Sequence, residues 1–251
     1  TIVFGTGDGG YVNLTNNFYD ITNTSKPPAR RWHAAAYSSS KDKIILFGGS
    51  GAGDSPLSDT WIYNPQTEQW SQKSPSVPPS ARFGHIMVSS GTNKAILFGG
   101  YGASGYLNDT WEYNFDTDNW TEVITVSSPS VLAYSCAAYD SDNNKIILFG
   151  GRSVDGTIQS STTWIYHING SSWTKGAYGP SSRKDAGACY DTENKKFLIS
   201  CGEGDGVNNY LSDTWAYDYA TNGWTNRIPS ANPSPARSEA EMFYDSRNNR
   251  S

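Results

Sequence analysis

The stretch that decides the fold is residues 43–70, which read KIILFGGSGAGDSPLSDTWIYNPQTEQW. An apolar run ends there in two glycines, a polar loop follows, and the chain resumes as Asp-Thr-Trp-x-Tyr, with a second tryptophan nine residues after the first. The same phrase returns at residues 94–120 and again at residues 145–173. Recurrence at a fixed distance is typical of repeat proteins, whose units bury their apolar surfaces against one another.

The tryptophans give the period of the repeat. A nine-residue separation occurs in four pairs: Trp61 and Trp70, Trp111 and Trp120, Trp164 and Trp173, and Trp215 and Trp224. The pairs follow one another at about 50 residues, which is a period of propellers, solenoids and arrays. Each repeat has room for four short strands and lacks helical apolar spacing, so we expect four-stranded antiparallel sheets and almost no helix.

Each of the four expected strands has its own character. The first is rich in small residues, as in HAAAY at residues 33–37, and suits the crowded position nearest an axis. The second, KIILF, is apolar on both faces and should be buried on both, and the glycines after it suit a loop with positive φ. The Trp-x-Tyr strand should fill the gap between neighbours, with the second tryptophan's strand at the outer edge. This layout predicts an all-β fold, a β-propeller of four-stranded blades.

The two ends of the chain complete the count of blades. Four whole repeats are expected at approximately residues 30–74, 82–123, 132–175 and 183–227. Residues 237–251 read as an inner strand alone and residues 1–22 as three outer strands alone, and Phe18 precedes Arg30 by the same distance as Trp70 precedes Arg82. We therefore predict that residues 1–251 form one domain of five blades, closed by pairing the N- and C-terminal strands, which removes exposed edges. The alternative is a fragment of a longer propeller.

At these residues the chain resembles the Kelch-repeat family. The paired glycines, the Trp-x-Tyr strand, the later tryptophan and the closing PPAR, PPSAR and PSPAR segments match the family's pattern over nearly the whole chain. The resemblance implies a propeller scaffold, which in this family hosts binding modules together with a few enzymes. The third repeat departs from the pattern, since it has Thr162 in place of aspartate and no arginine before its inner strand. Cys201 replaces the first glycine of the fourth repeat.

Composition narrows the classes of protein and of partner. The formal net charge of −5 argues against non-specific binding of nucleic acid, and no apolar run approaches the roughly 20 residues of a membrane span. The three cysteines lack metal-ligand spacing and are expected to be free, packed thiols. A Lys-poor surface rich in Ser, Thr and Asn favours an extracellular or cell-surface setting, with the cytoplasm as the alternative. Candidate glycosylation sequons, about as many as chance would give, occur at Asn13, Asn23, Asn108, Asn119 and Asn169.

Nothing in the sequence predicts catalysis, a metal or a cofactor. It lacks a nucleophile–base set, a phosphate-binding glycine loop and metal-ligand spacing. The histidines follow the repeat instead of converging on one site, so we expect structural or surface roles for His33, His85 and His167. Four residues of expected inner strands could surround a cation, although polar residues lining a wet channel are the preferred interpretation: His85, Asp185, Glu239 and Glu241.

The arginines before the inner strands are a better functional clue. Closure of the propeller would gather them at one end of the axis: Arg30, Arg31, Arg82, Arg183 and Arg237. Guanidinium groups suit carboxylates and polyhydroxylated ligands. The alternative, which their recurrence at equivalent positions favours, is that each arginine braces its own repeat by pairing with the aspartate of SDTW or NDTW.

Loop residues that do not recur are better candidates for specificity. We expect them beside the arginines, because the loops after the double glycines and those between blades lie at the same end of antiparallel blades. They are Asp54, Tyr101, Tyr106, Arg152, Asp155, Glu203, Asp205, Asn208, Asn209 and Tyr210. The sequence therefore predicts a non-catalytic module that binds a protein or glycan through this end. The alternatives are a self-associating structural subunit of a surface assembly and, least favoured, a metal-dependent Kelch-fold enzyme.

Overall fold

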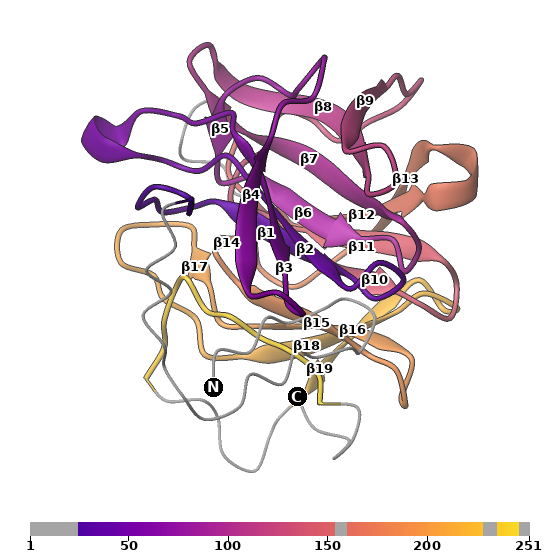
Figure 1. The fold of residues 1–251 in the computed structure, drawn as a ribbon. Coiled ribbons are helices and arrows are strands. Elements are labelled where there is room, and N and C mark those ends of the chain that lie inside the picture. Colours follow the sequence, from indigo (N-terminus) through magenta and orange to yellow (C-terminus); the bar gives the residue numbers. More distant parts are fainter. Residues whose placement is uncertain (1–24, 154–159, 228–234, 246–251) are drawn as a thin grey trace.

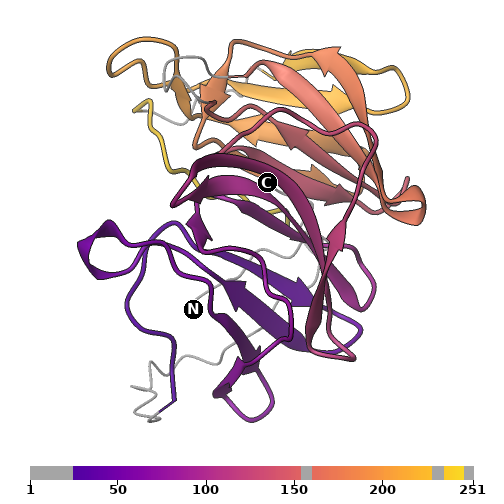
Figure 2. The ribbon, with the colours of Figure 1, turned by 90° about the horizontal axis from the view of Figure 1, so that it is seen from above.

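The computed structural model describes residues 25–153, 160–227 and 235–245. Apart from two 3-10 turns, η1 (Ala52–Asp54) and η2 (Ile168–Gly170), all regular structure in these ranges is β-strand. The large antiparallel sheets lie around a common centre as blades of a β-propeller (Figures 1 and 2). The prediction of an all-β propeller is confirmed. The fifth, split blade stays a prediction, because residues 1–24 and 246–251 lie outside the described residues.

The blades follow one another along the chain. The first blade has the strand order β1 (Ala34–Ser38), β2 (Lys43–Phe47), β3 (Thr60–Asn64) and β4 (Gln69–Lys73). In the second, β5 (Arg82–Phe83) and β6 (Ile86–Ser89) both pair with β7 (Lys94–Gly102), followed by β8 (Gly105–Asn114) and β9 (Asn119–Val123). The third has β10 (Cys136–Asp140), β11 (Lys145–Phe149), β12 (Thr162–His167) and β13 (Ser172–Tyr178). The fourth has β15 (Gly187–Asp191), β16 (Lys196–Ser200), β18 (Thr214–Asp218) and β19 (Gly223–Arg227), beside a short pair formed by β14 (Arg183–Lys184) and β17 (Glu203–Gly204).

The strands lie where their composition predicts. The inner strands β1, β10 and β15 are rich in small residues as predicted, whereas β6 of the second blade has the larger residues Ile86, Met87 and Val88. Neighbours among these four strands are in contact. The second strands are almost wholly buried, and apolar layers separate the first blade from the second, the second from the third, and the third from the fourth. The double glycines have positive φ, and Cys201 adopts the same conformation at +64°. In the described part of the chain, no helix is long and apolar enough to cross a membrane.

In the second, third and fourth repeats, the second tryptophan links its blade to the one before. Trp120 packs against Phe47 with ring centroids 5.1 Å apart, and its Nε1 donates to Thr60 Oγ1 at 3.0 Å. The same bond recurs from Trp173 to Thr110 and from Trp224 to Thr163, at 2.9 Å in both cases. The outer strand thus holds the blades together through buried or partly buried hydrogen bonds as well as apolar contact.

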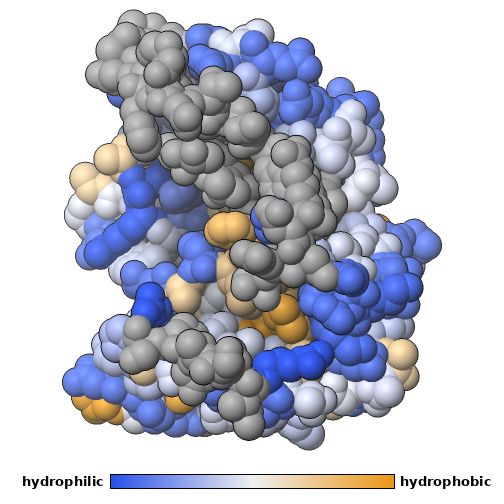
Figure 3. Space-filling model, turned by 90° about the horizontal axis from the view of Figure 1, so that it is seen from below, coloured by the Kyte–Doolittle hydropathy of each residue, from blue (hydrophilic) through white to orange (hydrophobic). Residues whose placement is uncertain are grey.

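The C-terminal segment packs along the fourth blade. Met242 and Tyr244 lie in a small apolar cluster with residues of β15, β16 and β18. The backbone N–H of Gly202 donates to the Arg237 carbonyl at 2.8 Å, as that of Gly49 does to Arg82 at 2.9 Å. Arg237 therefore has the place of a residue that leads into a further inner strand. Seen from the fourth-blade side, apolar side chains gather near the centre of the surface (Figure 3).

Candidate functional site

Two sets of loops form one end of the propeller, which we call the loop face. The loops before the inner strands pair with the loops after the double glycines through β5 with β7 and β14 with β17. The labels of β5, β14 and β17 lie on the left in Figure 1. Isolated bridges join Arg31 to Ser50 and Ala133 to Arg152 in the same way. The prediction that both sets of loops share one end is confirmed. The turns at the opposite end form the turn face.

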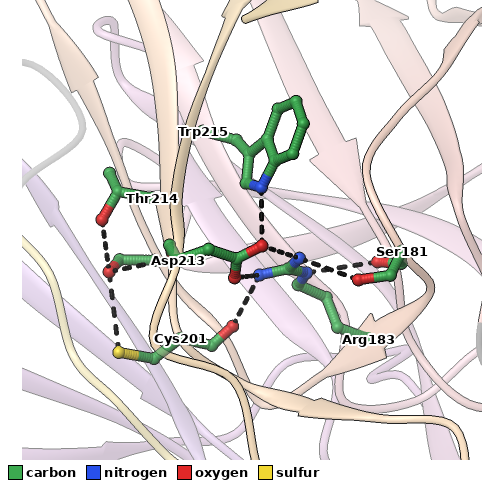
Figure 4. Close-up of polar contacts among 7 residues, drawn as sticks. Ser181, Arg183, Cys201, Asp213, Thr214 and Trp215 are labelled. Atoms are coloured by element: carbon green, nitrogen blue, oxygen red, sulfur yellow. Dashed lines mark hydrogen bonds and ion pairs between the residues drawn. The ribbon is translucent and has the colours of Figure 1, made fainter. Parts of the chain in front are cut away.

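Three of the predicted partner-binding arginines are buried. Arg82 Nη1 and Nη2 donate to the two carboxylate oxygens of Asp109 at 2.6 and 2.7 Å, and Nη1 also donates to the Gly99 carbonyl. Arg183 binds Asp213 and the Cys201 carbonyl in the same way (Figure 4). Arg30 pairs likewise with Asp59.

The exposures show that these three arginines brace their repeats. Arg82 is 0% and Arg183 1% exposed, and the Arg30 side chain is 3% exposed. The prediction that these guanidinium groups bind a partner is wrong for the folded chain, because a carboxylate and a carbonyl already use their donors. The alternative, a brace within each repeat, is confirmed.

The charge state of the aspartates follows from these contacts. Burial opposes ionisation of Asp59, Asp109 and Asp213, but the hydrogen bonds and charge of the partner arginine outweigh it. The pKa of each carboxyl therefore lies below its ordinary value. In these three repeats the first tryptophan adds a bond, since its Nε1 donates to the same carboxylate at 2.6 to 2.7 Å.

In the third repeat both members of the arginine–aspartate pair are replaced. Leu132 replaces the arginine and is 2% exposed, packed into the layer between the second and third blades. Thr162 replaces the aspartate. The two departures noted in the sequence are therefore one structural change.

His85 is buried at the start of the second inner strand. It is 6% exposed, and neither ring nitrogen has a partner of normal hydrogen-bond geometry among the described residues. Its ring packs edge-on against Phe47 at 5.6 Å. Burial, together with the charge of Arg82, lowers the pKa of His85 to about 3. The imidazole is thus neutral in the fold at any pH near 7.

We expect His85 to lower the stability of the folded protein in mild acid. The unfolded chain binds a proton at this residue near pH 6.5, whereas the folded chain does so only near pH 3, so unfolding becomes easier as the pH falls through that window. His85→Ser, which copies Ser135 of the third repeat, should lose about 1 to 2 kcal/mol less stability than the wild type between pH 6.5 and 5. Urea unfolding at both pH values measures this. Parallel losses in the two proteins would contradict the assignment.

An aromatic cluster lies on the loop face, contributed by the first three blades. The ring centroids of Trp32 and Phe83 are 5.5 Å apart, and those of Trp32 and Tyr134 are 6.0 Å apart. Phe83 lies 5.4 Å from Tyr101, which lies 4.9 Å from Tyr106. Tyr101 is 37% exposed and the other four rings are half-buried. These five residues are the aromatic cluster.

Five equivalent residues line the inner edge of this face, each two positions after the bracing arginine or its counterpart. These axial positions are Trp32, Gly84, Tyr134, Asp185 and Glu239, and all have positive φ, between 53° and 64°. Their backbones are joined in turn: Gly84 N donates to Trp32 O, Tyr134 N to Gly84 O, and Asp185 N to Tyr134 O, at 2.7 to 2.9 Å. A Cβ on Gly84 would lie 2.8 Å from the Tyr134 ring, so this ring covers the glycine.

Charged side chains surround the aromatic cluster. The Arg31 guanidinium lies 3.9 Å from the Trp32 ring centroid and pairs with Asp54. Lys184 Nζ lies 2.8 Å from Asp185 and 2.6 Å from Glu203. Burial opposes its charge, but these carboxylates outweigh burial and raise the pKa of Lys184.

The remaining predicted site residues divide by exposure. Those exposed on the loop face are Arg31, Asp54, Tyr101, Asp205, Asn208, Asn209, Tyr210 and Arg237, and those half-buried are Tyr106, Arg152 and Glu203. Asp155 lies outside the described residues. For all of these, partner binding stays a prediction. The sequence did not predict Trp32, Phe83 or Tyr134 as site residues, although Trp32 directly follows Arg31 and Phe83 directly follows Arg82.

The other candidate sites are simpler. Among the described residues no group of three or more His, Cys, Asp or Glu side chains is placed to hold a metal ion, and all three cysteines are buried free thiols, as predicted. Asn108 and Asn169 are exposed, and Asn119 is half-buried, with Oδ1 accepting from Ser76 N at 3.2 Å. Asn13 and Asn23 lie outside the described residues. Glycosylation stays a prediction.

Comparison with known proteins gives one family match and several partial relatives. The family described as the KLHDC2/KLHL20/DRC7 Kelch-repeats domain matches residues 11–177. The Rab9 effector protein with kelch motifs of Xenopus laevis is 37% identical over 81 residues, 31% of this chain and 22% of the relative. Kelch domain-containing protein 1 of Mus musculus is 36% identical over 78 residues, 31% and 19% of the two chains. Adagio-like protein 1 of Oryza sativa subsp. japonica is 29% identical over 127 residues, 48% and 20%. The aligned regions thus span about a fifth of each relative.

Proposed function

We propose that this chain, which belongs to the Kelch-repeat family, is a non-catalytic protein-binding module whose partner docks on the loop face. The observation that carries the proposal is the aromatic cluster, in which rings from three blades meet at one end of the axis. Aromatic residues are enriched at the centres of protein interfaces, because they bury a large area at small conformational cost. The names of the relatives, which include Rab9 effector proteins, support a protein as partner.

The bracing arginines support the proposal indirectly. They fix the bases of the loops through bidentate pairs between a buried guanidinium group and a partly buried carboxylate, so the aromatic rings are carried on a rigid frame. A rigid frame lowers the entropy lost on binding. A glycan partner, self-association and an extracellular setting stay predictions.

The proposal is tested by affinity capture with a matched control. Purified chain is used as wild type, as Tyr101→Ala/Tyr106→Ala on the loop face, and as Gln66→Ala/Glu193→Ala, two exposed residues of the turn face. The tyrosine variant should capture at least tenfold less of the proteins that the wild type captures, and the control variant should capture the same amount as the wild type. Depletion by the turn-face variant, with the tyrosine variant unaffected, would move the site to the other end of the propeller.

A further inference from the structure

The axial positions combine aromatic rings with carboxylates. Two of the five residues are aromatic, Trp32 and Tyr134, and two are acidic, Asp185 and Glu239. The two kinds are adjacent, since Trp32 Nε1 lies 3.4 Å from Glu239 Oε1 and the backbone N–H of Asp185 donates to the Tyr134 carbonyl at 2.9 Å. The axial positions themselves therefore present π faces and negative charge, with no cation among them.

Negative charge remains after the neighbouring ion pairs are counted. Lys184 is paired with both Asp185 and Glu203, so two carboxylates share one ammonium group. Glu239 is exposed and accepts the hydrogen bond from the Trp32 indole. Burial, followed by the charges of Glu239 and Glu203, raises the pKa of Asp185 against the pull of Lys184. A positive charge brought to this place would be favoured by both axial carboxylates.

The rings of the aromatic cluster already lie against cations of the chain itself. Arg31 stacks on Trp32 at 3.9 Å, and Lys184 Nζ lies 6.0 Å from the Tyr134 centroid. Such contacts stabilise a cation over an indole or phenol ring. The pair of Arg31 with Asp54 is exposed, with side-chain exposures of 55% and 69%. Exposed ion pairs of this kind contribute little to stability. A competing cation would meet small resistance at Trp32.

The backbone holds these side chains in place at a cost. Trp32, Tyr134, Asp185 and Glu239 all have φ between 53° and 60°, a region that disfavours residues with a Cβ. Gly84 shows that glycine fits the same place in the fold. Strain of this kind is concentrated at functional sites, and here it falls on the aromatic and acidic residues.

We infer that the axial positions bind a basic side chain, lysine or arginine, which a partner protein inserts at the centre of the loop face. Its charge lies against the π faces of Trp32 and Tyr134 and pairs with Glu239 and Asp185. This inference rests on the proposed function, since it names the chemistry that the loop face recognises in its partner.

Peptides selected from a random library displayed on phage provide the first test. Each selected peptide is synthesised, together with variants in which one lysine is replaced by norleucine or one arginine by citrulline. Both replacements remove the charge of the side chain and keep its length. Isothermal titration should show one basic position whose replacement weakens binding at least tenfold. Glu239→Gln should weaken the parent peptide about as much, and in that variant the neutral replacement should cost far less, because the two changes remove one interaction.

The outcomes separate the inference from the proposed function. Peptides that require Tyr101 and Tyr106 but tolerate every neutral replacement would overturn the cation site and leave the loop face as the binding surface. Peptides that bind the Tyr101→Ala/Tyr106→Ala protein as well as the wild type would count against both. If no peptide is enriched, the Trp32 indole N–H signal, assigned with Trp32→Phe, is followed by NMR. It should shift with Nα-acetyl-arginine amide and not with Nα-acetyl-norleucine amide, and equal responses would overturn the inference.

Discussion

Replacing Arg82 by leucine alone is expected to lower the free energy of unfolding by about 3 to 5 kcal/mol, because it leaves a partly buried carboxylate without its partner. Arg82 is fully buried, and Asp109 keeps only 23% of its side-chain exposure. The Asp109 carboxylate would lose two hydrogen bonds, and the Gly99 carbonyl would lose a third. Urea unfolding followed by circular dichroism and by tryptophan fluorescence measures the change.

The third repeat supplies the control. Arg82→Leu/Asp109→Thr copies Leu132 and Thr162, so it removes the charge that the single variant leaves unpaired. We expect this double variant to recover at least half of the lost stability, since exchanging a buried ion pair for apolar residues costs far less than breaking it. A double variant no more stable than Arg82→Leu, or a single variant as stable as the wild type, would contradict the bracing role.

The blades could be predicted from the sequence because the nine-residue separation of the two tryptophans reflects the register of the hairpin that carries them. In each repeat the second tryptophan lies opposite the tyrosine of Trp-x-Tyr, as Trp70 does opposite Tyr63 and Trp120 opposite Tyr113. A constant separation along the chain is thus a constant hairpin. The partner of the indole across the blade boundary could not be predicted, because the link from Trp120 to Thr60 depends on how two blades pack.

The sequence indicated the role of the arginines but not the aromatic cluster. Their recurrence with an aspartate, and the loss of both in one repeat, indicated a brace, which the structure confirms. The aromatic cluster gave no such pattern, since Trp32, Phe83 and Tyr134 come from different loops and only two of them share an equivalent position. Their contacts arise from blade order and from positive φ at Trp32 and Tyr134, which sequence patterns of strands do not reveal.

The fourth blade differs from the others where a further blade would pack. Ser200 stands where the first three blades have phenylalanine, and its hydroxyl lies 2.9 Å from that of Thr214. Thr214 is the counterpart of Thr60, which accepts a bond from a tryptophan of the following blade. In the predicted split blade the matching residue is Phe18, whose side chain has no N–H group to donate. Phe18 lies outside the described residues, so closure through the termini stays a prediction.

Tyr244→Ala is expected to lower the free energy of unfolding by about 2 to 4 kcal/mol, because it removes a large buried ring from the fourth blade. Tyr244 is 9% exposed and packs with Cys189, Leu198 and Ala216. Its neighbour Phe243 is 48% exposed, so Phe243→Ala should cost less than about 1 kcal/mol. Thermal and urea unfolding of both variants measure the difference. If Tyr244→Ala lowers the free energy of unfolding as little as Phe243→Ala does, the C-terminal segment is not part of the cooperative fold. In that case deletion of residues 237–251, which should otherwise cost more than Tyr244→Ala, would leave the melting temperature unchanged.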